Sequence, residues 1–240
     1  SLRDIRAAYT TVGQLLREVK PSVAHIHHVN NVGGIQACLD FCPTVMTTHG
    51  YQFICAASDF AFDALGQVCS RRCSDVWCYL ITWFGHCMSR NPHHAMGVLR
   101  RVKWSLRNAI RFALFISPSH YTAERHIRAG FPAERFHVLP YFSPMSPLSR
   151  PRKEPARPTI LFVGRLYPAK GYRVLIRAMT MLPEVNALIV GNVDGPAGKE
   201  ILRLVRKLKI GHRIELRDWV SREEIRALYE RATLLVVPSL

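Results

Sequence analysis

Short apolar strands alternate with amphipathic helices from residue 159 to the end of this chain, and no other sequence feature limits its fold as strongly. The strands are nearly continuous runs of Ile, Leu, Val and Phe. Strands of that composition are buried on both faces, and strands joined through helices run parallel. The sequence therefore predicts an α/β fold with a parallel sheet between two helical layers. We expect strands at 159–163, 185–190, 213–216 and 234–237, and helices at 171–181, 196–208 and 221–231.

The first part of the chain alternates in a similar way. A helix at 2–19 gathers its apolar side chains on one face and stops before Pro21. Gly33 and Gly34 are expected in a turn before a short helix, and residues 50–95 are expected to form an irregular insertion. The remaining elements predicted here are strands at 22–26, 44–48, 114–117 and 136–139 and a helix at 96–112.

Residues 143–158, with the sequence SPMSPLSRPRKEPARP, separate the two parts of the chain. Prolines remove backbone donors and fix φ, so this segment cannot join a helix or a sheet. We therefore predict two Rossmann-like domains, at 1–142 and 159–240, joined by a Pro-rich linker. Ligands of α/β proteins bind at the carboxyl ends of the strands, so we expect the site in a cleft between the two sheets.

The loop after the first strand of the second domain carries two cations. Gly164 allows the backbone to turn where the strand ends, Arg165 and Lys170 flank the loop, and Gly171 leads into a helix. A planar guanidinium, a point charge and backbone N–H groups suit a diphosphate. Neither GxGxxG nor GxxxxGK[ST] occurs here, which disfavours a hydride-transfer enzyme and a P-loop NTPase. The alternative is that both cations are ordinary solvated loop charges.

The second domain resembles the nucleotide-sugar-binding domain of glycosyltransferase family 4, also called glycosyl transferases group 1, a retaining GT-B family. The resemblance rests on FVGRLYPAKG at 162–171, LIRAMTMLP at 175–183, ALIVGNVDGP at 187–196 and the whole of 214–240. The first domain resembles the family's N-terminal domain more loosely, through KPSVAHIHH at 20–28, TVMTTHGY at 44–51 and the segment 115–141. The resemblance implies GT-B architecture with both domains incomplete, because a glycine-rich loop near the start and a paired-glutamate motif after PSL are missing. We expect such a fragment to have little or no transferase activity alone.

That resemblance implies transfer of a sugar, with retention of anomeric configuration, from a nucleotide-diphosphate sugar to a glycan or glycolipid. Arg165 and Lys170 would bind the diphosphate and stabilise it as it leaves, and no metal would be needed. His49, in the TTHG segment after the strand at 44–48, would lie near the donor sugar. The alternative is that it is an ordinary loop histidine held by hydrogen bonds. The expected catalytic residues are Arg165, Lys170 and His49, and the expected donor-binding residues are Gly164, Arg165, Lys170, Gly191, Trp219 and Ser239. The segment 217–219 (RDW) replaces a more usual Gly-containing turn at the edge that contacts the base.

The formal net charge is +16, which indicates an anionic partner. The excess is spread over both parts of the chain without a basic tail, so nucleic-acid binding is disfavoured. Part of the excess positive charge is concentrated on one helix that lacks acidic residues. The basic face of this helix is either simply solvated or a surface for anionic lipid headgroups. No apolar run could span a bilayer and no signal peptide is evident, so we expect a cytoplasmic protein, free or peripheral on the inner face of the membrane. The basic residues concerned are Arg100, Arg101, Lys103, Arg107 and Arg111.

The seven cysteines include five within residues 55–87. An odd count without a signal peptide favours reduced cytosolic thiols. The alternative is a structural zinc bound by Cys69, Cys73, Cys78 and either Cys87 or His86, although these spacings match no usual zinc pattern. His25, His27, His28, His93 and His94 also lack ligand spacing, and we expect surface or packing roles for them.

Two further functions remain open at this stage. A truncated, non-catalytic module could hold a nucleotide sugar or a protein partner. A UDP-sugar 2-epimerase shares GT-B architecture, but the GRLxxxKG motif belongs to the transferases. Assembly of cell-surface polysaccharide or glycolipid is the biological role that the resemblance suggests by analogy.

Overall fold

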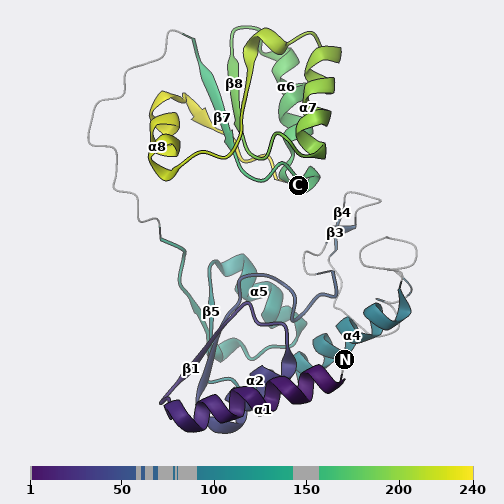
Figure 1. The fold of residues 1–240 in the computed structure, drawn as a ribbon, viewed down its shortest axis with the longest axis vertical. Helices are drawn as coiled ribbons and strands as arrows, with labels where there is room; N and C mark the ends of the chain where they lie inside the picture. The colour runs from purple at the N-terminus through teal and green to yellow at the C-terminus, as the bar shows by residue number, and fades with distance from the viewer. Residues whose placement is uncertain are drawn as a thin grey trace. The chain divides into compact units, whose positions relative to one another are not determined.

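The computed structural model describes residues 2–57, 91–142 and 157–239, together with positions 61, 62, 67–69, 78 and 80. The chain divides into two compact units, Ser1–Ser143 and Pro144–Leu240. Each unit contains a four-stranded sheet in which every pairing is parallel (Figure 1). The α/β class with two parallel sheets is therefore confirmed. Most of the predicted linker, 143–158, lies outside the described residues.

The sheet of the first unit has the strand order β1-β2-β5-β6. Its strands are β1 (Ala24–His27), β2 (Thr44–Thr47), β5 (Leu114–Ser117) and β6 (Phe136–Val138). Its helices are α1 (Leu2–Val19), α2 (Val32–Phe41), α4 (Pro92–Asn108) and α5 (His120–Ala129), with 3-10 turns at Ala109–Arg111 and Ala133–Arg135. In the predicted irregular insertion, β3 (Ala61–Phe62) pairs antiparallel with β4 (Gln67–Val68).

Aromatic side chains form the centre of the first unit. Phe115 of β5 is fully buried, and its ring centroid lies 5.1 Å from that of Phe112 and 5.0 Å from those of Phe131 and Phe136. These separations are typical of favourable aromatic pairs. The cluster fixes β5 and β6 against the turn that precedes β5, and so positions the carboxyl ends of these strands.

The prediction of a turn at Gly33 and Gly34 is wrong, because both glycines lie in the first turn of α2. Asn31 caps this helix by accepting a hydrogen bond from the N–H of Gly33 at 2.9 Å. A Cβ on Gly33 would lie 2.0 Å from the carbonyl oxygen of Ile5 in α1. Glycine is therefore present for close helix packing rather than for a turn.

The helix predicted at 96–112 begins earlier than expected, at Pro92. The Asn91 side chain accepts hydrogen bonds from the N–H groups of His93 and His94, and proline favours the first helical turn. After Asn108 the chain tightens into the 3-10 turn. The capping residues therefore decide where α4 begins, whereas the prediction relied on the spacing of apolar residues.

The sheet of the second unit has the strand order β10-β7-β8-β9. Its strands are β7 (Thr159–Val163), β8 (Asn186–Val190), β9 (Ile214–Arg217) and β10 (Leu234–Leu235). Its helices are α6 (Tyr172–Ala178), α7 (Pro196–Lys207) and α8 (Arg222–Arg231). Short 3-10 turns occur at Pro168–Lys170, Met179–Met181 and Gly211–Arg213.

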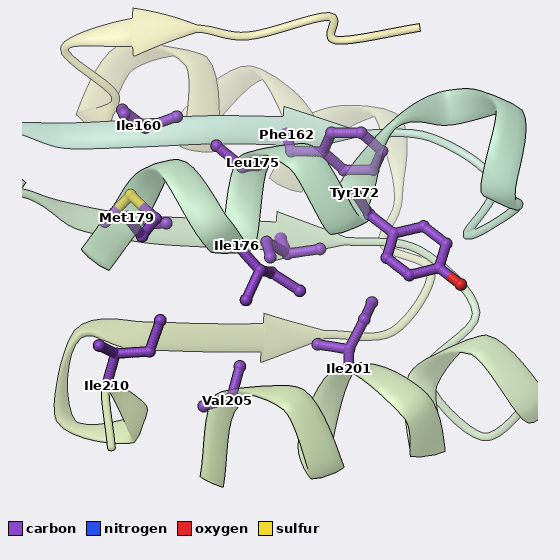
Figure 2. Packing of buried hydrophobic residues seen from close by; sticks show 11 residues of the cluster. Ile160, Phe162, Tyr172, Leu175, Ile176, Met179, Ile201, Val205 and Ile210 are labelled. Atoms are coloured by element: carbon purple, nitrogen blue, oxygen red, sulfur yellow. The ribbon is translucent and has the colours of Figure 1, made fainter. Parts of the chain in front are cut away.

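Helices cover both faces of this second sheet, as the apolar strands predict. Ile160 and Phe162 of β7 pack in one cluster with α6 and α7 (Figure 2). Leu161, between them in sequence, faces the other way and packs with Leu228 of α8. Successive side chains of a strand point to opposite faces, so one strand serves both layers. The sheet therefore lies packed between its helices, and loops follow the ends of its strands.

Candidate functional site

The loop between β7 and α6 is held compactly by its own backbone. The N–H of Gly164 donates to the carbonyl of Val190 at 3.0 Å, which extends the strand ladder by one residue. The N–H of Tyr167 donates to the carbonyl of Arg165, and the N–H of Lys170 donates to the carbonyl of Tyr167, both at 2.8 Å. Arg165 and Lys170 are exposed and form no ion pair with any other described residue. The loop therefore presents two cations to solvent.

The end of this loop lies against the segment that follows β10. A Cβ on Gly171 would lie 1.8 Å from the carbonyl oxygen of Pro238, and Gly171 has a φ of 70°. Ser239, a predicted donor-binding residue, is next in the chain and exposed. The first and last strands of the unit, β7 and β10, are neighbours in the sheet, and this reversal of strand order marks the usual ligand position in open α/β sheets.

The loops after β8 and β9 continue the same edge. A Cβ on Gly191 would lie 2.2 Å from the carbonyl oxygen of Gly164, and the N–H of Gly191 donates to the carbonyl of Arg217 at 3.0 Å. Trp219 follows β9 and has 58% of its surface exposed, and Tyr167 of the first loop has 59% exposed. The structure thus brings Gly164 and Gly191 into direct proximity, and it places Trp219 two residues beyond the strand that Gly191 contacts.

A hydrogen-bonded group anchors the helix that follows Gly171. Tyr172 is almost fully buried (Figure 2). Its hydroxyl donates to Oε2 of Glu200 in α7 at 2.9 Å. The Arg173 guanidinium binds both oxygens of the same carboxylate, at 2.5 and 2.8 Å. The pKa of Glu200 is held below its usual value chiefly by the hydrogen bond from Arg173, and burial raises the pKa of Tyr172. These contacts tie α6 to α7 and fix the end of the cationic loop.

His49 lies in the first unit, directly after β2. Its Nδ1 is 2.5 Å from the Tyr141 hydroxyl, and its Nε2 is 2.9 Å from Nδ1 of His27. Burial lowers the pKa of His49, and the neighbouring histidines 27, 28 and 25 lower it further. His49 belongs to the first unit and the loop 164–171 to the second.

The sequence reasoning missed the partners of His49. His25 and His27, expected only on the surface or in packing, are hydrogen-bonded to each other and through His27 to His49. The signal was present in the letters AHIH, because period-two spacing puts both rings on one face of β1. Parallel pairing with β2 sets His27 opposite Thr47, two residues before His49.

The basic residues of the predicted membrane surface fall into three groups. Arg100, Lys103 and Arg107 are exposed on one side of α4, whereas Arg101 is partly buried. Arg111 forms an ion pair with Asp40 at 2.5 Å. None of the helices in the described part of the chain is both long enough and apolar enough to cross a bilayer.

Three candidate ligands of the predicted zinc site lie outside the described residues: Cys73, His86 and Cys87. Among the residues that the structure does describe, no three or more His, Cys, Asp or Glu side chains form a group that could hold a metal ion. Cys69 is a free thiol.

Models of two known families match the chain, one on each unit. The model for "Glycosyltransferase Family 4" matches residues 1–142, and the model for "Glycosyl transferases group 1" matches residues 149–240. The chain belongs to glycosyltransferase family 4. This confirms the resemblance that the GRLYPAKG and TTHG segments carry.

Solved GT-B glycosyltransferases share the fold. HepE of Anabaena in complex with UDP-glucose superposes with a TM-score of 0.61 at 18% identity, over 96% of this chain and 56% of that one. Sucrose-phosphate synthase of Thermosynechococcus elongatus gives a TM-score of 0.62 at 18% identity, over 96% of this chain and 53% of that one. The chain thus spans about half the length of these structures, and the GT-B architecture is confirmed.

Curated relatives include two differently named glycosyltransferases. The D-inositol 3-phosphate glycosyltransferase of Mycobacterium sp. (strain KMS) is 34% identical over 89 residues, which are 36% of this chain and 20% of the relative. The alpha-D-kanosaminyltransferase of Streptomyces kanamyceticus is 27% identical over 154 residues, which are 57% of this chain and 39% of the relative. The aligned parts are well short of either relative's whole length.

Proposed function

We propose that the protein containing this chain transfers a sugar from a nucleotide-diphosphate sugar to a glycan or lipid-linked acceptor, and that Arg165 and Lys170 bind the diphosphate. The observation that carries this proposal is the compact loop 164–171, which presents two exposed cations at the reversal point of a parallel sheet. Family membership and the UDP-glucose complex of HepE support the class of donor.

The chemistry explains why cations are needed at this place. When the bond between the anomeric carbon and the phosphate oxygen breaks, the electron pair goes to the oxygen, so negative charge develops on the leaving diphosphate. A guanidinium and an ammonium that are already in position stabilise that charge without reorganisation. These side chains can do so without a metal ion. The acceptor hydroxyl forms the new bond to the anomeric carbon and gives its proton to an oxygen of the leaving diphosphate.

We assign the remaining contacts to the same edge of the second sheet. The exposed rings of Tyr167 and Trp219 offer flat surfaces for a base, and Ser239 offers a hydroxyl beside the end of the cationic loop. Gly164 leaves open space after β7, and Gly191 lets the loop after β8 pack directly against the backbone of Gly164. For the stereochemical course we propose retention, which is supported by the family resemblance and is tested on the complete protein by NMR of the product anomer.

Calorimetric titration of the chain with UDP, GDP and ADP in the presence of EDTA tests the donor site. We expect one nucleotide to bind without metal. Arg165→Ala and Lys170→Ala should each weaken binding about 10- to 100-fold, the usual effect of losing a charge-assisted hydrogen bond. Arg177→Ala, which removes an exposed cation farther along α6, is the matched control and should bind normally. Failure of all three nucleotides to bind would contradict the proposal.

We also propose that an anionic membrane surface receives α4. Support comes from the exposed Arg100, Lys103 and Arg107, which share a helix with the exposed apolar side chain of Met96. The chain should cosediment more with vesicles that contain roughly 30% phosphatidylserine than with vesicles of phosphatidylcholine alone, and salt should reduce this binding. Equal behaviour of the two vesicles, or an unchanged result for the triple Glu variant at these positions, would refute it.

A further inference from the structure

Three imidazole rings and two hydroxyl groups form a continuous line of hydrogen bonds across β1, β2 and the segment after β6. The line runs from the Tyr141 hydroxyl to His49, then to His27 and His25, and ends at Oγ1 of Thr47. The four distances are 2.5, 2.9, 3.3 and 2.8 Å in that order. Both nitrogens of every ring are engaged. We call these three histidines the imidazole chain.

The number of protons in this line is limited by its geometry. Each of the two contacts between rings joins a nitrogen to a nitrogen, so each holds one hydrogen, donated from one side and accepted on the other. The outer nitrogens, Nδ1 of His49 and Nε2 of His25, can each be protonated or free. Three neutral rings carry three N–H hydrogens: two lie in the contacts between rings and one is on an outer nitrogen. With one extra proton, both outer nitrogens carry a hydrogen. A second extra proton would place two N–H groups against each other and break a contact between rings.

The two ends of the line differ chemically, and this difference selects a direction for the neutral state. A phenol is a stronger acid than an aliphatic alcohol, so Tyr141 is the better donor and the Thr47 oxygen is the better acceptor. The hydroxyl of Tyr141 then donates to Nδ1 of His49, and each ring donates from Nε2 to the next group along. His49 is thereby held in the tautomer with its hydrogen on Nε2. One extra proton reverses only the contact with Tyr141, which becomes an acceptor and can turn its own O–H outward.

We propose that His25 and His27 are positioning residues for His49, and that the imidazole chain acts as one unit that takes up a single proton and couples it to the direction of the Tyr141 hydroxyl. The proposal rests on the function proposed above only in giving His49 a place beside the donor sugar. His27 is exposed, so a solvent proton can reach the middle ring. Such a unit fixes the ring and the charge of His49 from outside the reaction centre.

The electrostatic surroundings favour a single proton. The pKa of His25 is lowered by burial and then by His27, and the pKa of His49 is lowered by burial and then by histidines 27, 28 and 25. His28 faces His49 with ring centroids 6.0 Å apart, and Tyr141 stacks on His49 with an angle of 9° between the rings. Among the described residues, no carboxylate and no Lys or Arg contributes to either shift. Repulsion among the rings is therefore uncompensated, and coupled titration is expected.

NMR of the chain with ¹⁵N-labelled histidine tests this proposal without any turnover. At pH 8 we expect His49 to carry its hydrogen on Nε2. On acidification the signals of the three rings should change together as one proton is taken up, and the next proton should enter only at a lower pH. His27→Phe should remove the tautomer preference of His49 and let it titrate alone, because the ring that accepts its Nε2 hydrogen is lost. His27→Gln keeps one donor and one acceptor, so it should restore the tautomer but not the shared proton.

His28→Asn is the matched control, because His28 lies near His49 and makes no hydrogen bond with it within the described residues. Its φ of 51° also suits asparagine. It should leave the tautomer and the shared titration intact. If His49 titrates independently in the parent chain, or if His27→Phe leaves its tautomer and pKa unchanged, the proposal is wrong. Nucleotide binding by the second unit is measured separately, so failure of either proposal is recognised without the other.

Discussion

Gly171 and Pro238 approach each other so closely that no side chain fits between them. A Cβ on Gly171 would lie 1.8 Å from the carbonyl oxygen of Pro238 and 2.7 Å from its carbonyl carbon. The φ of 70° at Gly171 is also a conformation that other residues adopt at a cost. The contact joins the cationic loop to the segment that carries Ser239. Two parts of the proposed donor site, far apart in sequence, therefore depend on one glycine.

Gly171→Ala should weaken nucleotide binding by about tenfold or more and destabilise the second unit by about 2 kcal/mol, because the loop must move and the positive φ becomes strained. Calorimetry and urea unfolding measure the two effects. Gly97→Ala is the control, since nothing lies within 4 Å of its Cβ position on the exposed side of α4. That variant should bind normally and gain up to about 1 kcal/mol from helix propensity. Normal binding by Gly171→Ala would show that the contact is not needed.

Arg213 is a buried cation that stabilises the second unit through backbone carbonyls. Its guanidinium donates to the carbonyl oxygens of Met179, Leu182 and Val185, and only 7% of the residue is exposed. Arg213→Met should therefore lower the free energy of unfolding by about 3 kcal/mol, as three buried acceptors lose their donor. Urea unfolding of that unit measures this loss. Arg206→Met, at an exposed position of α7, should change it by less than about 0.5 kcal/mol. Similar losses in both variants would contradict the assignment.

His126 makes the stability of the first unit depend on pH. Its Nδ1 donates to the carbonyl of Thr122 at 2.8 Å, its Nε2 is buried without a partner among the described residues, and burial lowers its pKa from 6.5 to about 4. The unfolded chain therefore takes up this proton first as the pH falls. Stability is complete above about pH 6.5 and decreases towards pH 4, by about 3 kcal/mol in all.

Unfolding of the first unit at pH 7 and pH 4.5 checks this expectation. His126→Leu should remove most of the difference in unfolding free energy between the two pH values. Phe112→Leu changes the buried cluster that includes Phe131, a neighbour of His126, and should lower stability about equally at both. An undiminished pH dependence in His126→Leu would assign it to other groups.

The strands were predictable because their composition and their period are local properties of the sequence. The strand at 159–163 and the strand at 114–117 lie where the runs of apolar residues place them. Helix ends were less predictable when a capping side chain decided them, as Asn91 does for α4. Gly33 was misjudged because its reason is a contact with Ile5 in another helix, and periodicity carries no information on which helices touch.

The candidate site likewise combines features that are local in sequence with features that depend on the tertiary structure. The pairing of Arg165 and Lys170 on one loop follows from the strand before it and the glycines around it, which are local features. The partnership of His49 with Tyr141 joins residues 92 positions apart, and it depends on β2 and β6 ending at the same edge of one sheet. The order of strands in a sheet is a tertiary property, so the individual residues could be named from the sequence while the imidazole chain could not.

Two adjacent glycines of α2 offer a sharp test of helix packing in the first unit. A Cβ on Gly33 would lie 2.0 Å from the carbonyl oxygen of Ile5, whereas a Cβ on Gly34 would lie 3.4 Å from a methyl group of Val12, an ordinary contact. Gly33→Ala must therefore push α1 away from α2 and should cost about 2 kcal/mol or more. Gly34→Ala should cost less than about 1 kcal/mol, since better helix propensity offsets the tighter fit. Thermal unfolding of the two variants measures the difference, and equal stabilities would show that the two helices do not pack as described.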